Sequence, residues 1–237
     1  MIACLFAALI PILNPVEAIL TDIEGTTTSI SFVHDTLFPY AKQHVREYVL
    51  AHENDANVQK ILKDVEEVAM VPSDQVVDTL LAWMEQDKKI TPLKALQGMM
   101  WEEGYRQGAF KGHVYDDAYQ QLSLWKTQGI DLYVYSSGSV QAQKLLFGYS
   151  THGDMTPLFS NYFDTKIGGK KESTSYRMIA QQIGLAPQYI LFLSDSVDEL
   201  NAAQESGMQT MLLNREGALL NDCGHRVVVN FSEISIP

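Results

Sequence analysis

The sequence predicts an α/β fold in which a mainly parallel sheet is interrupted by an all-helical insertion. After residue 113, short apolar segments alternate with amphipathic helical segments, whereas residues 31–113 show helical periodicity alone. Several apolar segments also end abruptly in small and acidic residues, which is typical of buried strands that lead into functional loops. These observations favour one discontinuous α/β core and a separate helical domain.

The first expected strand covers residues 17–20 and leads into the polar run at residues 21–27. Apolar residues then recur at the 3.6-residue spacing of a helix face. One face contains Val58, Ile61, Leu62, Val65, Val68 and Ala69, and another contains Val76, Val77, Leu80, Leu81 and Met84. Because no strand pattern occurs there, residues 31–113 are expected to form an all-helical insertion.

The second half of the chain alternates strands with helices. Strands are expected at residues 130–135, 189–193, 210–213 and 226–229, and helices at residues 140–147 and 172–183. Two further helices are expected, one with Tyr119, Leu122 and Trp125 on one face and closed by Gly129, and one with Leu200 and Ala203 that leads to Gly207. Such alternation implies right-handed crossovers and a sheet covered on both faces. The predicted catalytic core therefore consists of residues 16–30 and 114–237.

Composition narrows the class of partner. The 237-residue chain is 46% hydrophobic and has a net charge of -12, so it lacks the basic surface that nucleic acids or anionic membranes require. Cys4 and Cys223 form no disulfide framework and no cluster with zinc spacing. We expect a cytoplasmic monomer that acts on a small molecule.

The first 15 residues are almost entirely apolar and could be read as part of a signal peptide. However, no Lys or Arg precedes Lys42, Pro11 interrupts the run, and the segment is too short to span a bilayer. We interpret residues 1–15 as an N-terminal extension outside the core.

Polar residues follow three of the expected strands. Asp22 and Glu24 follow the first, Ser136 and Ser137 a later one, and Asp195 a third. Ligands of open α/β sheets bind at the carboxyl ends of the strands, so these side chains are expected to share one site. Close carboxylates need a cation or a proton between them, and an oxygen-rich site suits Mg²⁺ better than zinc.

These motifs, in this order, resemble those of the haloacid dehalogenase superfamily. The resemblance implies a Rossmannoid core in which Asp22 attacks phosphorus and Glu24 is the general acid and base. It also implies that Ser136, Ser137 and a lysine bind phosphate, and that Asp22, the backbone carbonyl of Glu24 and Asp195 hold one Mg²⁺ per chain. The lysine is assigned as Lys170, rather than Lys166 or Lys171, because the run DTKIGGKKES at residues 164–173 resembles the corresponding motif.

Glutamate at position 24 departs from the aspartate usual in the superfamily. The runs DIEGTT (residues 22–27), YSSGSV (135–140), QKLLFG (143–148) and FLSD (192–195) resemble the enolase-phosphatases of methionine salvage. This resemblance alone implies a 2,3-diketo-5-methylthiopentyl-1-phosphate substrate. A capped phosphatase for phosphoglycolate or a sugar phosphate is the alternative enzyme, and a sensor of a phosphorylated metabolite is a non-enzymatic one.

Two assignments near the site remain open from the residues themselves. Asp198 and Glu199 are equally consistent with support of the metal and with ordinary acids in the first turn of a helix. Ser136 and Ser137 could cap the helix that follows them. We expect Ser139 to be the cap, which leaves the earlier pair available for phosphate.

Overall fold

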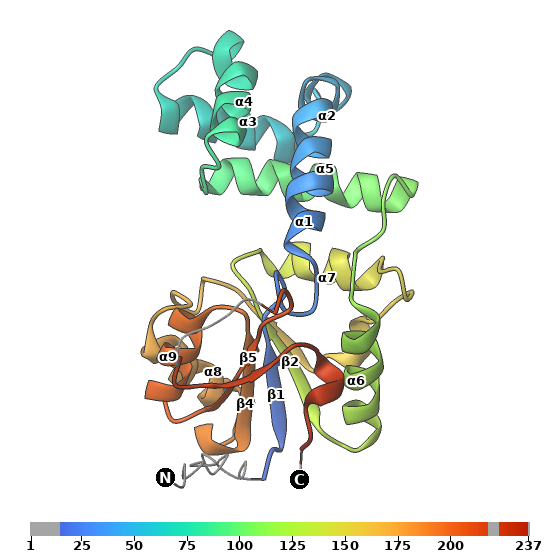
Figure 1. Ribbon diagram of the computed structural model, residues 1–237. Helices are drawn as coiled ribbons and strands as arrows, with labels where there is room; N and C mark the ends of the chain where they lie inside the picture. The colour runs from blue at the N-terminus through green and yellow to red at the C-terminus, as the bar shows by residue number, and fades with distance from the viewer. Residues whose placement is uncertain (1–14, 218–222, 237) are drawn as a thin grey trace, which may run out of the picture. The chain divides into compact units, whose positions relative to one another are not determined.

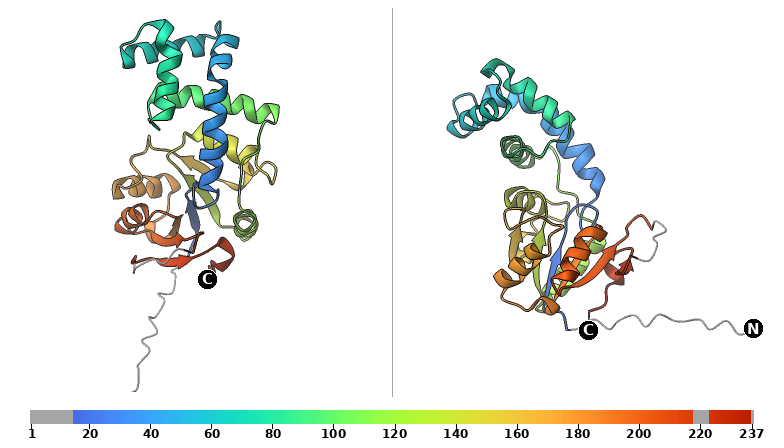
Figure 2. Two further views of the ribbon diagram at one scale, coloured as in Figure 1. Left: turned by 45° about the horizontal axis from the view of Figure 1, so that its top comes forward. Right: turned by 90° about the vertical axis from the view of Figure 1, so that its left-hand side faces the viewer.

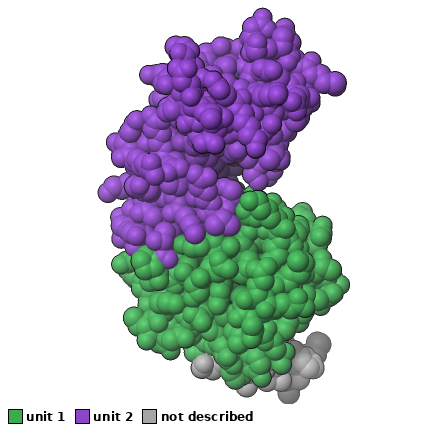
Figure 3. Space-filling view, turned by 180° about the vertical axis from the view of Figure 1, so that it is seen from behind, with its two compact units in different colours: residues 1–27, 115–137, 157–237 green, residues 28–114, 138–156 purple. Residues whose placement is uncertain are grey.

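The computed structural model describes residues 15–217 and 223–236. The chain divides into an α/β unit (residues 1–27, 115–137 and 157–237) and a helical unit (residues 28–114 and 138–156), coloured separately in Figure 3. Of the expected N-terminal extension, residues 1–14 lie outside the described residues. No helix in the described ranges is long and apolar enough to cross a membrane.

The α/β unit contains a six-stranded parallel sheet, which confirms the predicted fold class. The strand order is β3-β2-β1-β4-β5-β6. The strands are β1 (Ala18–Thr21), β2 (Asp131–Tyr135), β3 (Asn161–Phe163), β4 (Ile190–Ser194), β5 (Gln209–Leu213) and β6 (Arg226–Val228). Because the order reverses between β1 and β4, the loops after these two strands flank the position where ligands bind in doubly wound sheets.

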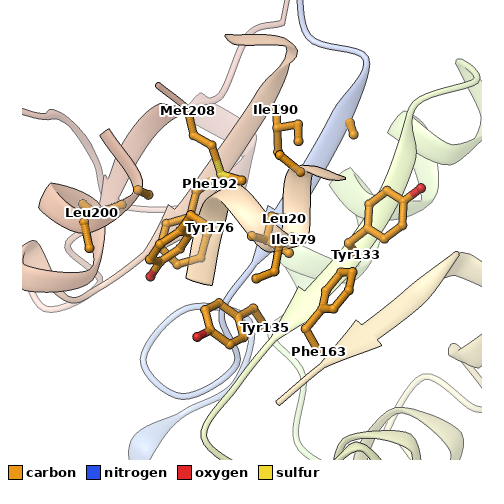
Figure 4. Close-up of a cluster of buried hydrophobic side chains, with 14 of the residues drawn as sticks. Leu20, Tyr133, Tyr135, Phe163, Tyr176, Ile179, Ile190, Phe192, Leu200 and Met208 are labelled. Carbon is orange, nitrogen blue, oxygen red and sulfur yellow. The ribbon is translucent and has the colours of Figure 1, made fainter. Parts of the chain in front are cut away.

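Helices cover the sheet on both faces. In Figure 1, α8 (Ser173–Ile183) and α9 (Val197–Glu205) lie on one side of the strands and α6 (Asp116–Thr127) on the other. Figure 4 shows the cluster on the α8 and α9 side, where Leu20 and Phe192 pack among aromatic rings that include Tyr135 and Tyr176. Successive strand residues point to opposite faces, so every residue of β1 is buried.

The strand β3 is absent from the sequence-based prediction. It contains only three residues, begins with Asn161 and pairs with β2 through Tyr133, Val134 and Tyr135. Such a short segment carries too little alternation to indicate a strand. It becomes extended because the edge of β2 offers it hydrogen-bonding partners.

The helical unit contains the expected amphipathic helices. Its elements are α1 (Ile30–Phe32), a π-helical turn (Val33–Leu37), α2 (Phe38–Ala51), α3 (Ala56–Ala69), α4 (Val76–Glu85), α5 (Thr91–Gln107) and α7 (Val140–Gly148). Helices α2 to α5 surround one apolar core. The ribbons of this helical segment are seen from two further directions in Figure 2. The spacing places Val68 on the same helix face as Val58, but Val68 is 55% exposed. It lies ten positions after Val58 and is therefore turned about 80° away from it.

The segment after β2 groups with the helical unit. The backbone N–H of Gly112 donates to the carbonyl of Tyr149 over 2.8 Å, and that of Thr151 donates to the carbonyl of Gly112 over 2.9 Å. These bonds connect residues 138–156 to the end of the segment that includes α5. The sequence predicts that residues 138–156 belong to the catalytic core, whereas here they group with the helical unit. The boundaries between catalytic core and cap remain a prediction.

Candidate active site

Asp22 lies at the carboxyl end of the central strand β1. Its backbone N–H donates to the carbonyl of Leu193 over 2.9 Å, which extends the pairing of β1 with β4 by one residue. The residue is only 5% exposed. A buried carboxylate needs a partner, and the Nζ of Lys170 provides it at 2.5 Å from the Asp22 Oδ1.

The loop after Asp22 is fixed by buried threonines. The Thr27 hydroxyl lies 3.3 Å from the carbonyl oxygens of both Asp22 and Ile23 and donates to them. The Thr26 hydroxyl accepts the backbone N–H of Asp195 over 3.1 Å. The loop after β1 is thereby joined to the end of β4, and the two acidic motifs predicted from the sequence lie together.

Lys170 connects two carboxylates. Besides the bond to Asp22, its Nζ lies 2.7 Å from Glu199, which also accepts the hydroxyl of Ser194 over 3.1 Å. Burial alone would lower the pKa of Lys170, but Asp22 and Glu199 outweigh it and raise that pKa. Burial and the charge of Asp22 raise the pKa of Glu199 to about 7. The ammonium is therefore a permanent positive charge in an otherwise acidic cluster.

The acidic cluster has the composition of a hard-cation site. Burial, followed by the charges of Asp22 and Glu24, raises the pKa of Asp195 to about 6. A Cβ placed on Gly25 would collide with the carboxylate of Asp195, so the backbone after Glu24 passes directly beside that group. Among the described residues no three His, Cys, Asp or Glu side chains form a metal cluster. The expected ligands are only two carboxylates, those of Asp22 and Asp195, and the backbone carbonyl of Glu24. This set agrees with the lack of a three-side-chain cluster and with the close approach of the backbone to Asp195, and oxygen ligands suit Mg²⁺.

The other predicted residues lie at the same edge of the sheet or close to it. Ser136 directly follows β2, is 5% exposed and donates its backbone N–H to the carbonyl of Phe163. Ser137 and Glu24 are exposed. Ser139 accepts the backbone N–H of Ala142, which confirms it as the cap of α7.

The structure distinguishes the three candidate lysines by their surroundings. Lys166 and Lys171 are exposed, and Lys171 forms an ion pair with the exposed Asp198. Lys170 is 8% exposed and reaches Asp22. Of the two acids left open by the sequence, Glu199 therefore lies at the site and Asp198 faces solvent.

Sequence reasoning missed Arg215. Its Nε donates to the carbonyl of Thr26 over 2.8 Å, its Nη1 forms an ion pair with Asp117 at 3.0 Å, and its guanidinium lies 3.9 Å from the centre of the Tyr115 ring. Arg215 thus links the loop that follows Asp22 to Asp117 in α6. It follows β5 by two positions in a run without any recognisable motif, so no signal in the sequence indicated this role.

Comparison with known proteins agrees with this geometry. The family model described as haloacid dehalogenase-like hydrolase matches residues 16–207. Enolase-phosphatase E1 of Methylococcus capsulatus is 56% identical over 85% of this chain and 90% of its own length, and that of Pseudomonas aeruginosa strain LESB58 is 53% identical over 93% and 99%. The UTR4 protein of Saccharomyces cerevisiae superposes with a TM-score of 0.79 at 36% identity, covering 92% of this chain and 100% of that one.

The fold and the site therefore define a hydrolase of the haloacid dehalogenase-like class. Within that class, the chain belongs to the enolase-phosphatase E1 family. CbbY of Rhodobacter sphaeroides in complex with phosphate, at 16% identity and a TM-score of 0.60, shares the fold.

Gly25 offers a test of the close packing between the two acidic loops. Gly25 and Gly108 have nearly the same left-handed backbone, with φ of +72° and +74°, but a Cβ on Gly108 meets nothing within 4 Å. Both alanine variants should lose about 1 kcal/mol of stability to backbone strain. We expect only Gly25→Ala to displace Asp195 as well and to lower kcat/KM by roughly 10²-fold or more, as a misplacement of about 1 Å does. Thermal unfolding and steady-state kinetics measure the two effects. Equal kinetic losses in both variants would contradict this account.

Proposed function

We propose that this chain converts 2,3-diketo-5-methylthiopentyl-1-phosphate into the acireductone 1,2-dihydroxy-3-keto-5-methylthiopentene and phosphate, a step of L-methionine salvage. The observation that carries the proposal is the buried Asp22–Lys170 pair beside Asp195, at the point where the strand order reverses. The name enolase-phosphatase E1, borne by relatives at 53–56% identity, supports the choice of substrate.

The proposed phosphatase step is a double displacement. A carboxylate oxygen of Asp22 forms a bond to phosphorus, the bond from phosphorus to the enol oxygen breaks, and Glu24 gives its proton to that oxygen. Glu24 then takes a proton from a water molecule, which attacks phosphorus, releases phosphate and restores Asp22. Glu24 leaves the first half of the reaction as a carboxylate, which is the form that the second half requires, and the proton it takes from water restores its acid form for the next turnover.

The remaining residues have charge-balancing and binding roles in this proposal. The ammonium of Lys170 offsets negative charge on the phosphoryl oxygens. The hydroxyls of Ser136 and Ser137 donate hydrogen bonds to phosphate oxygens. One Mg²⁺ per chain, held by Asp22, Asp195 and the carbonyl of Glu24, would supply Lewis-acid stabilisation of the dianionic phosphate.

Three further properties belong to the same proposal. Residues 31–113 act as a cap that excludes water and selects the substrate. The partner is a small phosphate ester, because the net charge of -12 disfavours nucleic acid and anionic membrane surfaces. We also propose that the enzyme acts as a monomer in the cytoplasm.

The enolase step distinguishes this proposal from a phosphatase of other specificity. Abstraction of a proton next to a carbonyl builds an enol that is conjugated with the remaining carbonyl and still carries the phosphate, which creates a new near-ultraviolet chromophore. We expect this chromophore to appear before phosphate when the diketone, or its desthio analogue, is turned over anaerobically with Mg²⁺. The measurement is absorbance and phosphate release followed on the same sample. Phosphate release without enol absorbance, or faster turnover of phosphoglycolate than of the diketone, would move the assignment to the alternative phosphatase. Failure to hydrolyse any phosphate ester would favour a metabolite sensor.

A further inference from the structure

Three successive backbone carbonyls in the loop that carries Lys170 each accept a hydrogen bond from a side-chain hydroxyl. Tyr135 donates to Gly168 over 2.9 Å, Ser175 donates to Gly169 over 2.8 Å, and Tyr176 donates to Lys170 over 2.7 Å. The donors belong to the last residue of β2 and to the first turns of α8. We call the hydroxyls of Tyr135, Ser175 and Tyr176 the hydroxyl triad.

The loop depends on these bonds because it has no regular secondary structure between Asp164 and Glu172. Only short turn bonds occur within it, such as the N–H of Glu172 to the carbonyl of Gly169 at 3.1 Å. Carbonyls withdrawn from water need donors, and the hydroxyl triad provides three in a row. The hydroxyls therefore supply the hydrogen bonds that backbone N–H groups would supply in a strand or a helix, and so fix this backbone.

The three donors are themselves held rigidly by the core. All three residues are fully buried. The Tyr135 and Tyr176 rings meet edge to face with centroids 5.5 Å apart, and the Tyr176 ring lies 5.1 Å from that of Phe192 on β4. A Cβ on Gly168 would collide with the hydroxyl of Ser175, so the loop approaches α8 as closely as glycine permits. The packing of the sheet thus fixes the hydroxyls, and the hydroxyls fix the loop.

The hydrogen bonds of the hydroxyl triad determine where the Lys170 ammonium lies. Its Nζ must lie within bonding distance of two carboxylates, at 2.5 Å from Asp22 and 2.7 Å from Glu199, at the end of a flexible four-carbon chain. A shift of the loop backbone would move the ammonium away from the nucleophile, and such misplacements are costly for rate. We propose that the hydroxyl triad is a positioning device for Lys170, an inference that rests on the proposed phosphatase function.

Single-hydroxyl deletions test the proposal. Tyr176→Phe, Tyr135→Phe and Ser175→Ala each remove one donor and preserve the packing of the remaining atoms. We expect Tyr176→Phe to lower kcat/KM for the phosphate ester roughly 10-fold or more, because it releases the carbonyl of Lys170 itself. Tyr133→Phe is the matched control: Tyr133 lies on the same strand as Tyr135 and in the same core cluster, but the carbonyls of residues 168–170 take their hydrogen bonds from the hydroxyl triad and not from Tyr133. It should leave kcat/KM unchanged.

A double-mutant cycle separates positioning of Lys170 from a general structural role. If Tyr176 acts through the ammonium, its loss should matter little once Lys170→Gln has removed that group. We therefore expect Tyr176→Phe to change kcat/KM less than twofold in the Lys170→Gln background. An unchanged kcat/KM for Tyr176→Phe in the wild-type background, or the same fold-loss in both backgrounds, would overturn the proposal.

A readout independent of catalysis covers the case in which the proposed function is wrong. The ammonium protons of a buried, doubly ion-paired lysine exchange slowly, so ¹⁵N-lysine labelling should give a resolved NMR signal that disappears in Lys170→Gln. Tyr176→Phe should shift or broaden this signal, whereas Tyr133→Phe should not. If the signal is unaffected by Tyr176→Phe, the positioning role fails whatever the activity. If it shifts in a protein that hydrolyses no phosphate ester, the proposed function fails and the positioning of Lys170 stands.

Discussion

Asp22→Asn should abolish turnover while the fold persists. The amide cannot form the aspartyl phosphate, and loss of a nucleophile slows comparable hydrolases by on the order of 10⁴-fold or more. Steady-state phosphate release under saturating Mg²⁺ measures the loss, and Asp131→Asn, an exposed aspartate at the start of β2, is the control. Near-normal activity of Asp22→Asn would show that another residue is the nucleophile.

The charges around Lys170 explain why this variant should remain folded. Lys170 faces two carboxylates, so Asp22→Asn leaves a balanced pair with Glu199.

The folded-state pKa of Glu199 is raised to about 7 by burial and by Asp22, from an ordinary value of 4.5. This group therefore contributes stability that is fully present below pH 4.5 and is lost as the pH rises through about 7.

The thermal stability of the metal-free protein should therefore decrease as the pH rises. We expect the wild-type melting temperature to fall between pH 5 and pH 8, and to fall less in Asp22→Asn because one cause of the raised Glu199 pKa is gone. Scans at the two pH values, with a chelator present, measure the difference. A larger fall in the variant than in the wild type would contradict the assigned charge interaction.

Much of the sheet was predictable because its strands are buried on both faces. The expected strands at residues 130–135 and 189–193 correspond to β2 and β4 within one residue at each end. Continuous apolar runs that end in polar residues are strong signals. The strand β3 gave no such signal, because three residues at the edge of a sheet take their conformation from the neighbouring strand.

The site was predictable to the extent that its residues occur in motifs at strand ends. Asp22 and Asp195 follow β1 and β4, and the parallel sheet brings these ends together. The preference for Glu199 over Asp198 was not predictable, because both occupy the first turn of α9 and only one faces Lys170. Arg215 was not predictable either, since its contacts with Thr26 and Asp117 join segments far apart in the chain.

Glu24→Gln should slow turnover by roughly 10²- to 10⁴-fold, the range expected for the loss of general acid–base catalysis. The variant keeps Asp22, its pairing with Lys170 and the backbone carbonyl of residue 24, so binding and nucleophilic attack remain possible. Both proton transfers are impaired, but only the second half of the reaction needs a deprotonated water nucleophile. Phosphoenzyme should therefore form and persist, which makes its accumulation a more specific result than the lower rate.

Rapid quenching in acid followed by mass analysis detects this intermediate as an added phosphoryl group on the peptide that contains Asp22. We expect a larger phosphorylated fraction in Glu24→Gln than in the wild type, and none in the double variant that also carries Asp22→Asn. Glu205→Gln, at an exposed glutamate at the end of α9, controls for the removal of one surface charge and should turn over normally. A full rate in Glu24→Gln without detectable phosphoenzyme would remove Glu24 from the proton-transfer role. Accumulated phosphoenzyme together with a slow rate would place Glu24 at the hydrolysis of the aspartyl phosphate, because that step alone consumes the intermediate.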